Sequence, residues 1–257
     1  MIKNLVQILL RLVLFIFLFF IVGLTLQSQD YATAVGLAIA SLVDYIVFER
    51  KRWIIGFTMD RLTSDFSKGM VAGFLTLITI YAIVYLFGGH KLVGVAFDKE
   101  AILIWFVICL VVALSEEIFI RGYVYGRLRY LFSGLVASVI SSGLFAALHI
   151  FRAGFTLTAF TTLFFAGIMY AFMREKSGAL WLPVGFHFAW NYTSGILGIW
   201  RGEQLVLITE SSQGTLIHGG VYGIEGSIVT ALLFLILTAV IGFRIVRDVT
   251  PRVQMKR

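Results

Sequence analysis

The sequence has 257 residues, of which 60% are hydrophobic and only 14% are charged, and its formal net charge is +7. Soluble domains usually carry about 25% charged residues, so this composition excludes an ordinary soluble domain and indicates an integral membrane protein. The basic residues lie between long apolar runs and so do not predict nucleic-acid binding, and the one cysteine, Cys109, excludes an intramolecular disulfide and a cysteine-based metal site.

Eight apolar runs are candidates for membrane-spanning helices, which need about 20 mostly apolar residues. In chain order they cover approximately residues 5–26, 31–48, 69–89, 102–128, 134–150, 156–173, 179–199 and 227–246. The first run is too long for a signal-peptide core and lacks a small-residue cleavage site, so we expect a retained helix. No linker, low-complexity tract or repeat divides the chain. The sequence therefore predicts a single all-α domain, residues 1–257, folded as a polytopic transmembrane bundle of about eight spans.

Lysine and arginine predict how these spans are oriented, because short cytoplasmic loops carry an excess of both. With the N-terminus inside, 16 of the 21 basic residues fall on the inner side. They are Lys3, Arg50, Lys51, Arg52, Arg61, Lys68, Arg121, Arg127, Arg129, Arg174, Lys176, Arg244, Arg247, Arg252, Lys256 and Arg257. Arg11 falls within the first span, and Lys91, Lys99, Arg152 and Arg201 fall outside. This bias predicts that both termini are cytoplasmic.

Three clusters of polar residues interrupt the apolar runs. A charged group inside a bilayer costs at least about 2.5 kcal/mol on the insertion scale, so each cluster requires a reason. Ser115–Gly122 lies on the fourth predicted span, Phe145–His149 on the fifth and His187–Asn191 on the seventh.

The spacing in the first cluster separates two adjacent glutamates. Glu117 and Arg121 are four residues apart, so they lie on one helix face and are expected to pair. Such a pair is often no more than a stabilising device. Glu116 is rotated by about 100° from Glu117 and is left as a carboxylate free for another role.

The other two clusters repeat this four-residue spacing. His187 and Asn191 are expected to project to the same side of their helix, and Phe145 is placed to contact the imidazole of His149. A lone histidine in a membrane helix can simply bond to a neighbouring carbonyl. Two histidines, an asparagine and an unpaired glutamate on three helices together favour a functional site.

The depth of each polar side chain in the bilayer follows from the helical rise. If the fourth span continues to Arg127, Glu116 lies about 16 Å below the cytoplasmic surface. His149 lies about 22 Å below it, and His187 and Asn191 lie about 14 and 20 Å below it. The three helices therefore bring their polar residues to a similar level.

The three clusters resemble the signature motifs of the CAAX-protease and bacteriocin-processing (CPBP, or Abi) family of intramembrane proteases. The family pattern is Glu-Glu-x-x-x-Arg, then Phe-x-x-x-His, then His-x-x-x-Asn, and all three motifs occur here in order. The resemblance covers a catalytic core of about residues 100–200. It implies a multi-pass protein, which we expect in a prokaryotic cell (inner) membrane, surrounded by lipid.

The residues and this resemblance together assign catalytic roles. Glu116 is expected to be the general base, with His149 holding the same water, and His187 and Asn191 are expected to donate hydrogen bonds to the oxyanion. A second group of residues supports them: Glu117 and Arg121 are expected to hold the fourth helix and orient Glu116, and Phe145 to contact His149. The implied substrate is a peptide or protein, either one with a prenylated CAAX C-terminus or a bacteriocin-type peptide.

Alternatives remain open at this stage. We favour a mechanism without a cofactor, but Glu116, His149 and His187 would also serve as three zinc ligands of a metalloprotease. Carboxylates and histidines in spans also occur in proton-coupled transporters. A non-catalytic scaffold or immunity protein is the third possibility. Asp44 lacks the Gly-x-Gly-Asp context of aspartyl intramembrane proteases, so we interpret it as a locally bonded polar residue or as one near the cytoplasmic end of its helix.

Overall fold

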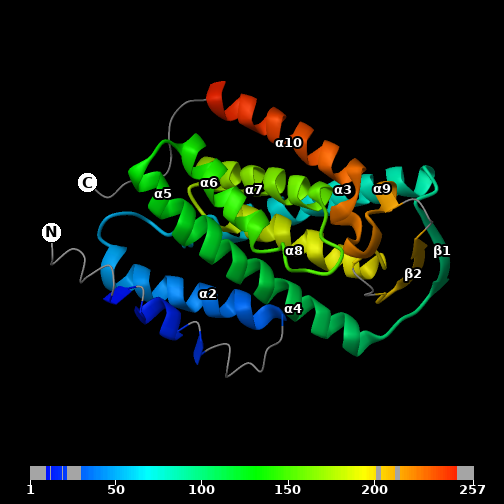
Figure 1. Cartoon of the computed structure of the whole chain (residues 1–257), viewed down its shortest axis with the longest axis horizontal. Helices are drawn as coiled ribbons and strands as arrows, with labels where there is room; N and C mark the ends of the chain where they lie inside the picture. Colours follow the sequence, from blue (N-terminus) through cyan, green and yellow to red (C-terminus); the bar gives the residue numbers. More distant parts are fainter. Residues whose placement is uncertain are drawn as a thin grey trace.

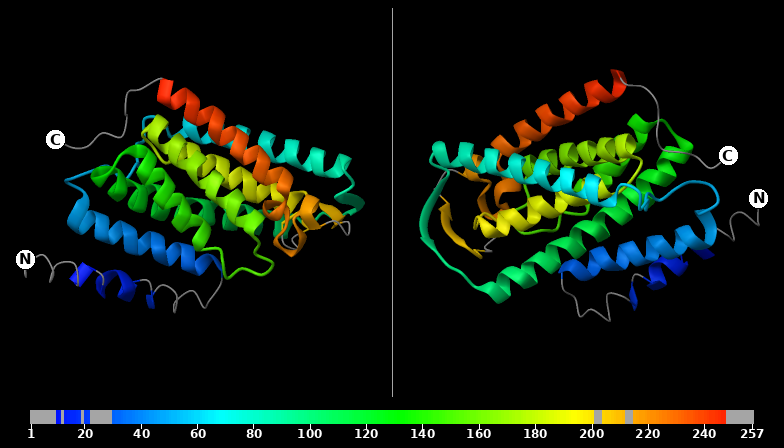
Figure 2. Two further views of the ribbon diagram at one scale, coloured as in Figure 1. Left: turned by 45° about the horizontal axis from the view of Figure 1, so that its top comes forward. Right: turned by 180° about the vertical axis from the view of Figure 1, so that it is seen from behind.

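The computed structural model describes residues 10–11, 13–18, 20–21, 30–200, 204–211 and 215–247, and this part of the chain is mostly helical, which confirms the predicted helical bundle (Figure 1). Its α-helices are α2 (Asp30–Asp44), α3 (Leu62–Leu86), α4 (Lys99–Glu117), α5 (Tyr125–Leu131), α6 (Gly134–Ala147), α7 (Leu157–Ser177), α8 (Trp181–Ile196), α9 (Thr215–His218) and α10 (Ile228–Arg247). Shorter helical turns are η1 (Tyr45–Glu49), η2 (Ile118–Val124), η3 (Gly220–Tyr222) and η4 (Ile224–Gly226). In Figure 2, α2 and α10 lie on opposite sides of the bundle.

Within the described residues, four helices are long and apolar enough to cross a membrane: Tyr31–Glu49, Leu62–Leu86, Lys99–Leu131 and Leu157–Ser177. They correspond to the predicted spans 31–48, 69–89, 102–128 and 156–173. Gly134–Ala147 and Ile228–Gly242 are shorter apolar helices that correspond to 134–150 and 227–246, and α8 is a 16-residue helix within 179–199. The first predicted span, 5–26, and the two termini lie largely outside the described residues. The number of spans and the orientation stay predictions.

The fourth predicted span is one continuous helical segment formed by α4, η2 and α5. It begins at Asp98, whose side chain accepts hydrogen bonds from the backbone N–H groups of Glu100 and Ala101. The π-helical segment η2 starts directly after Glu117, and π-helical insertions are frequent at functional sites. Because the helix continues past Arg127 and Arg129, the condition for the depth argument is met.

Helix α8 lies in the interior of the bundle, packed directly against α3. A Cβ atom on Gly69 would lie 2.2 Å from the carbonyl oxygen of Leu182, and one on Gly185 would lie 2.2 Å from that of Phe66. Small residues at such positions allow membrane helices to approach closely. The glycines therefore set the spacing of the two helices, and α8 carries His187 and Asn191 into the interior.

A short antiparallel sheet departs from the all-α prediction. Strand β1 (His90–Val95) pairs with β2 (Leu207–Ser211), with His90 opposite Ser211. The sheet lies at the end of the bundle opposite α5 and the C-terminal end of α10 (Figure 1). It joins the segment between α3 and α4 to the segment that follows α8. The strands were missed because their short, mixed sequences lie between stronger apolar runs.

A charged cluster connects helices that are distant in sequence. Arg11 forms ion pairs with Asp44 (2.6 Å) and Glu49 (2.8 Å). Arg127 also pairs with Glu49, at 2.6 Å, and the hydroxyl of Tyr123 donates to Asp44. Asp44 is thus a paired polar residue, as predicted, but its partners lie on segments that are distant in sequence.

Candidate active site

Glu117, at the end of α4, is completely buried and accepts two hydrogen bonds on one oxygen. Nη1 of Arg121 lies 2.9 Å from Oε1 of Glu117, which confirms the pair that the spacing predicts. Nδ1 of His187 lies 3.0 Å from the same oxygen. A carboxylate oxygen between two donors accepts from both, so Nδ1 of His187 carries a proton. Glu117 therefore contacts a predicted catalytic histidine directly, in addition to its predicted partner Arg121.

Arg121 is held by more than its ion pair. Its guanidinium carbon lies 4.3 Å from the ring centroid of Phe145 and 5.0 Å from that of Tyr170, and Nη2 donates to the carbonyl of Gly167 at 3.4 Å. Aromatic faces stabilise a buried cation through their ring quadrupoles. These contacts fix the cation that in turn fixes Glu117.

Glu116 has a different environment, although it is the next residue. Its side chain retains 15% exposure, whereas that of Glu117 has none. Oε2 of Glu116 lies 3.8 Å from Nε2 of His187, and Oε1 lies 3.7 Å from Nη2 of Arg152. Both distances exceed that of a hydrogen bond. Glu116 is thus the carboxylate of the pair that is open to solvent and close to two cationic or polar groups.

His149 lies where α6 ends, in contact with Phe145 as predicted. Its Nδ1 is 2.8 Å from the carbonyl oxygen of Phe145, and the ring centroids of the two residues are 4.9 Å apart. Because a carbonyl can only accept, Nδ1 donates, and in the neutral imidazole Nε2 holds the lone pair. The ring of Phe145 also lies 6.3 Å from that of His187. Phe145 therefore separates and aligns the two histidines.

Asn191 lies one turn beyond His187 on α8, as the spacing predicts, and is buried. Its Oδ1 makes no hydrogen bond within the described part of the chain. Buried polar atoms are nearly always paired in folded proteins, and an unpaired one requires an explanation such as a ligand or water. The amide oxygen of Asn191 is thus available to accept a hydrogen bond from a bound group.

Among the described residues, no group of three His, Cys, Asp or Glu side chains is placed to hold a metal ion. Nδ1 of His187 is bound to Glu117, and Nδ1 of His149 is bound to a carbonyl. Nε2 is therefore the nitrogen of each ring that is left for another partner, and such an Nδ1 bond also accompanies histidines that ligate metals. The choice between a glutamate base and zinc stays a prediction.

Residues 98–193 match the family model described as type II CAAX prenyl endopeptidase Rce1-like. This stretch of the chain is similar to the Rce1-like family, which confirms the resemblance to CAAX proteases. Four helices of membrane-spanning length among the described residues indicate an integral membrane protein. All seven residues of the three predicted motifs lie inside the matched stretch. No curated protein matches the chain.

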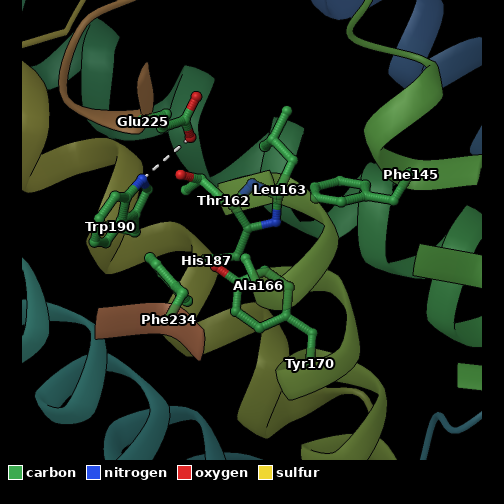
Figure 3. Close-up of a pocket in the computed structure, with 9 residues that line it drawn as sticks. All are labelled: Phe145, Thr162, Leu163, Ala166, Tyr170, His187, Trp190, Glu225 and Phe234. Carbon is green, nitrogen blue, oxygen red and sulfur yellow. Dashed lines mark hydrogen bonds between the residues drawn. The ribbon is translucent and has the colours of Figure 1, made fainter. Parts of the chain in front are cut away.

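A small cavity with a volume of about 20 Å³ lies beside His187 (Figure 3). Its walls are Phe145, Thr162, Leu163, Ala166, Tyr170, His187, Trp190, Glu225 and Phe234. The indole of Trp190 donates to Glu225 at 3.2 Å, and the hydroxyl of Thr162 has no hydrogen-bond partner in the described region. A cavity of this size with several polar partners is sufficient for one water molecule.

Two charged residues near the site were not predicted from the sequence. Arg152 was predicted only as a basic residue on the outer side, which stays a prediction; the structure places it in an ion pair with Glu116. Arg152 follows His149 by only three residues, and this proximity in sequence could have been used to predict that it lies near the site. Glu225 lies in η4, outside the three motifs and outside the matched Rce1-like stretch. Its only sequence signal is an acidic residue between two glycines, directly before an apolar run.

Proposed function

We propose that the protein is an intramembrane endopeptidase in which Glu116 activates a water molecule for attack on a peptide carbonyl. The observation that carries this proposal is that two adjacent glutamates have different partners and different exposure. Glu117 is committed to Arg121 and His187, whereas Glu116 is partly exposed and lies 3.8 Å from His187. A general base must reach both water and substrate, and of the two side chains only that of Glu116 keeps exposed surface.

The mechanism requires three steps from these residues. Glu116 removes a proton from the water as the oxygen attacks the carbonyl carbon, and Nε2 of His149 accepts the second hydrogen bond of that water. The tetrahedral oxyanion then accepts hydrogen bonds from His187 and Asn191. Glu116 returns the proton to the leaving amine as the C–N bond breaks, so that the base is regenerated.

His187 has a specific protonation requirement in this scheme. Its Nδ1 proton is donated to Glu117, and only Nε2 is left for the oxyanion. The imidazole must therefore carry both protons when it stabilises the intermediate. Glu117 contributes to catalysis by fixing the position of the His187 ring, and Arg121 fixes the position of Glu117.

The proposed substrate is a peptide with a prenylated CAAX-type C-terminus, supported by the match to the type II CAAX prenyl endopeptidase model. The charge bias of the loops supports a site open to the cytoplasm, and the resemblance to bacteriocin-processing proteases supports a prokaryotic cell membrane. A bacteriocin-type peptide is the alternative substrate. No metal is needed for this chemistry, because the carboxylate supplies the base and the side chains supply the oxyanion donors.

The test compares membranes that contain the native protein with membranes that contain Glu116→Ala, and identifies new peptide termini by mass spectrometry. Termini that appear with the native protein alone support the enzyme and identify its substrate. Glu100→Ala is a matched control, since Glu100 is an exposed glutamate in the first turn of the same helix. Identical termini from native and Glu116→Ala membranes would leave a scaffold role as the explanation.

A further inference from the structure

Arg152 lies beside Glu116, in the loop between α6 and α7. Its side chain is 33% exposed, and Nη2 is 3.7 Å from Oε1 of Glu116. Among the described residues, no other lysine or arginine forms an ion pair with Glu116. A partly exposed guanidinium thus faces the proposed base.

The loop is held in place by contacts that do not involve this ion pair. Gly154 has φ +72°, and a Cβ atom there would lie 2.7 Å from Cβ of Val221 and 2.8 Å from the backbone nitrogen of Tyr222. The ring of Phe155 packs edge-on against that of Tyr222, with centroids 5.6 Å apart. Packing against η3 therefore positions Arg152, and its side chain is free to change partner.

The N–H donors of the Arg152 guanidinium make no hydrogen bond within the described part of the chain. Its ion pair with Glu116, at 3.7 Å, is too long to be a hydrogen bond. An arginine has five N–H donors in a planar fork that matches a carboxylate, and such bidentate pairs are strong and specific. Arg121, by contrast, is completely buried and bonded to Glu117.

We propose that Arg152 binds a carboxylate of the substrate and thereby determines which peptides Glu116 cleaves. This inference rests on the proposed function. In the resting protein Arg152 pairs with Glu116; an incoming carboxylate takes over the guanidinium and leaves Glu116 free to accept a proton from water. The carboxylate is either the C-terminal one or an acidic side chain. A leaving peptide of three residues is at most about 10 Å long when extended, so its terminal carboxylate stays within that distance of the cleaved bond.

The experiment measures kcat and KM for S-farnesylated peptides that end in Cys, two aliphatic residues and a final residue. One pair of peptides differs in a C-terminal acid or amide. A second pair, both amides, differs in a final Glu or Gln. For the native protein we expect the peptide with the recognised carboxylate to be favoured at least tenfold, chiefly through KM. The pair that shows this preference identifies the source of the carboxylate.

Variants of Arg152 test the assignment. Arg152→Gln should bring the preference close to one, and Arg152→Lys should restore part of it, because a lysine keeps the charge without the planar fork. Arg61→Gln is the matched control: Arg61 is exposed and ion-paired with Asp65 at 3.1 Å, away from the site. It should keep the native preference. An unchanged preference in Arg152→Gln, or none in the native protein, overturns the proposal.

Binding separates this proposal from the proposed function. Glu116→Gln cannot act as the base, so its affinity for the same peptides is independent of turnover. Affinity that falls in Glu116→Gln/Arg152→Gln for the carboxylate peptides alone supports Arg152 even where no cleavage is detected. Equal affinities for all peptides in both proteins reject it, even where the native protein is an active protease.

Discussion

At the scale of single residues, Glu117 illustrates how one carboxylate connects structure to chemistry. It accepts hydrogen bonds from Arg121, which is completely buried, and from His187. Removing one partner of a buried ion pair leaves an uncompensated charge and typically costs 3–5 kcal/mol, whereas removing both partners together is often neutral. The structural role and the role in holding His187 can therefore be separated by mutation.

We expect Glu117→Ala to lower the unfolding free energy by about 3–5 kcal/mol and to abolish cleavage. Glu117→Ala/Arg121→Met should recover much of that stability, because no charge is left unpaired, but should remain inactive since His187 has lost its partner. Thermal unfolding in detergent and a peptide-cleavage assay provide the two measurements. A stable and fully active double variant would show that Glu117 serves the fold alone.

At the scale of elements, the site depends on the distance between α3 and α8. Gly185 lies two residues before His187, at a point where the backbone of α3 leaves no room for a side chain. A methyl group there must push the helices apart, and overpacking of this kind typically costs 1–3 kcal/mol. Because α8 carries His187 and Asn191, such a shift also moves the proposed oxyanion donors.

Gly185→Ala should therefore destabilise the protein by about 1–3 kcal/mol and reduce kcat more than it changes KM. The matched control is Gly143→Ala on α6, where no atom lies within 4 Å of the added Cβ. The control should be as stable as the native protein or slightly more so, with native activity. Equal effects of the two substitutions on unfolding temperature and kcat would contradict this account of helix spacing.

At the scale of the whole molecule, the sequence predicts features that depend on local spacing, namely helices and pairs of residues on one helix face. It does not predict contacts between residues on different helices. Apolar length identifies most of the helices, and the four-residue spacing identifies the Glu117–Arg121 pair. The hydrogen bond between His187 and Glu117 joins α8 to α4. It was not predicted, because the spacing of residues along α8 does not determine how this helix is rotated about its axis relative to α4. The proximity of Arg152 to Glu116 was not predicted, because α6 ends at Ala147 and the position of the loop that follows depends on packing that no local pattern encodes.

The strand pair and α9 contain a group that links the stability of the whole fold to pH. His90 in β1 is buried, stacks on Tyr81 at 5.9 Å between ring centroids, and lies 6.1 Å from His218. Neither nitrogen of its ring makes a hydrogen bond in the described region. Burial, together with repulsion from His218, lowers the pKa of His90 from 6.5 to about 4. The folded protein therefore favours the neutral ring.

This shift determines the direction of the pH dependence. Between pH 6.5 and 4 the unfolded chain protonates at His90 and the folded protein does not, so stability falls as the pH is lowered through this range and is constant above it. The loss attributable to His90 is at most about 3 kcal/mol.

Thermal unfolding in detergent from pH 8 to pH 4 measures this loss, with His90→Phe as the reference, because phenylalanine keeps a buried ring without a titrating group. Above pH 6.5, the plot of stability against pH should have the same slope for the native protein as for His90→Phe. Below pH 6.5, the stability of the native protein should fall more steeply. Parallel curves over the whole range would mean that the ring of His90 takes up its proton within the folded protein as readily as in water.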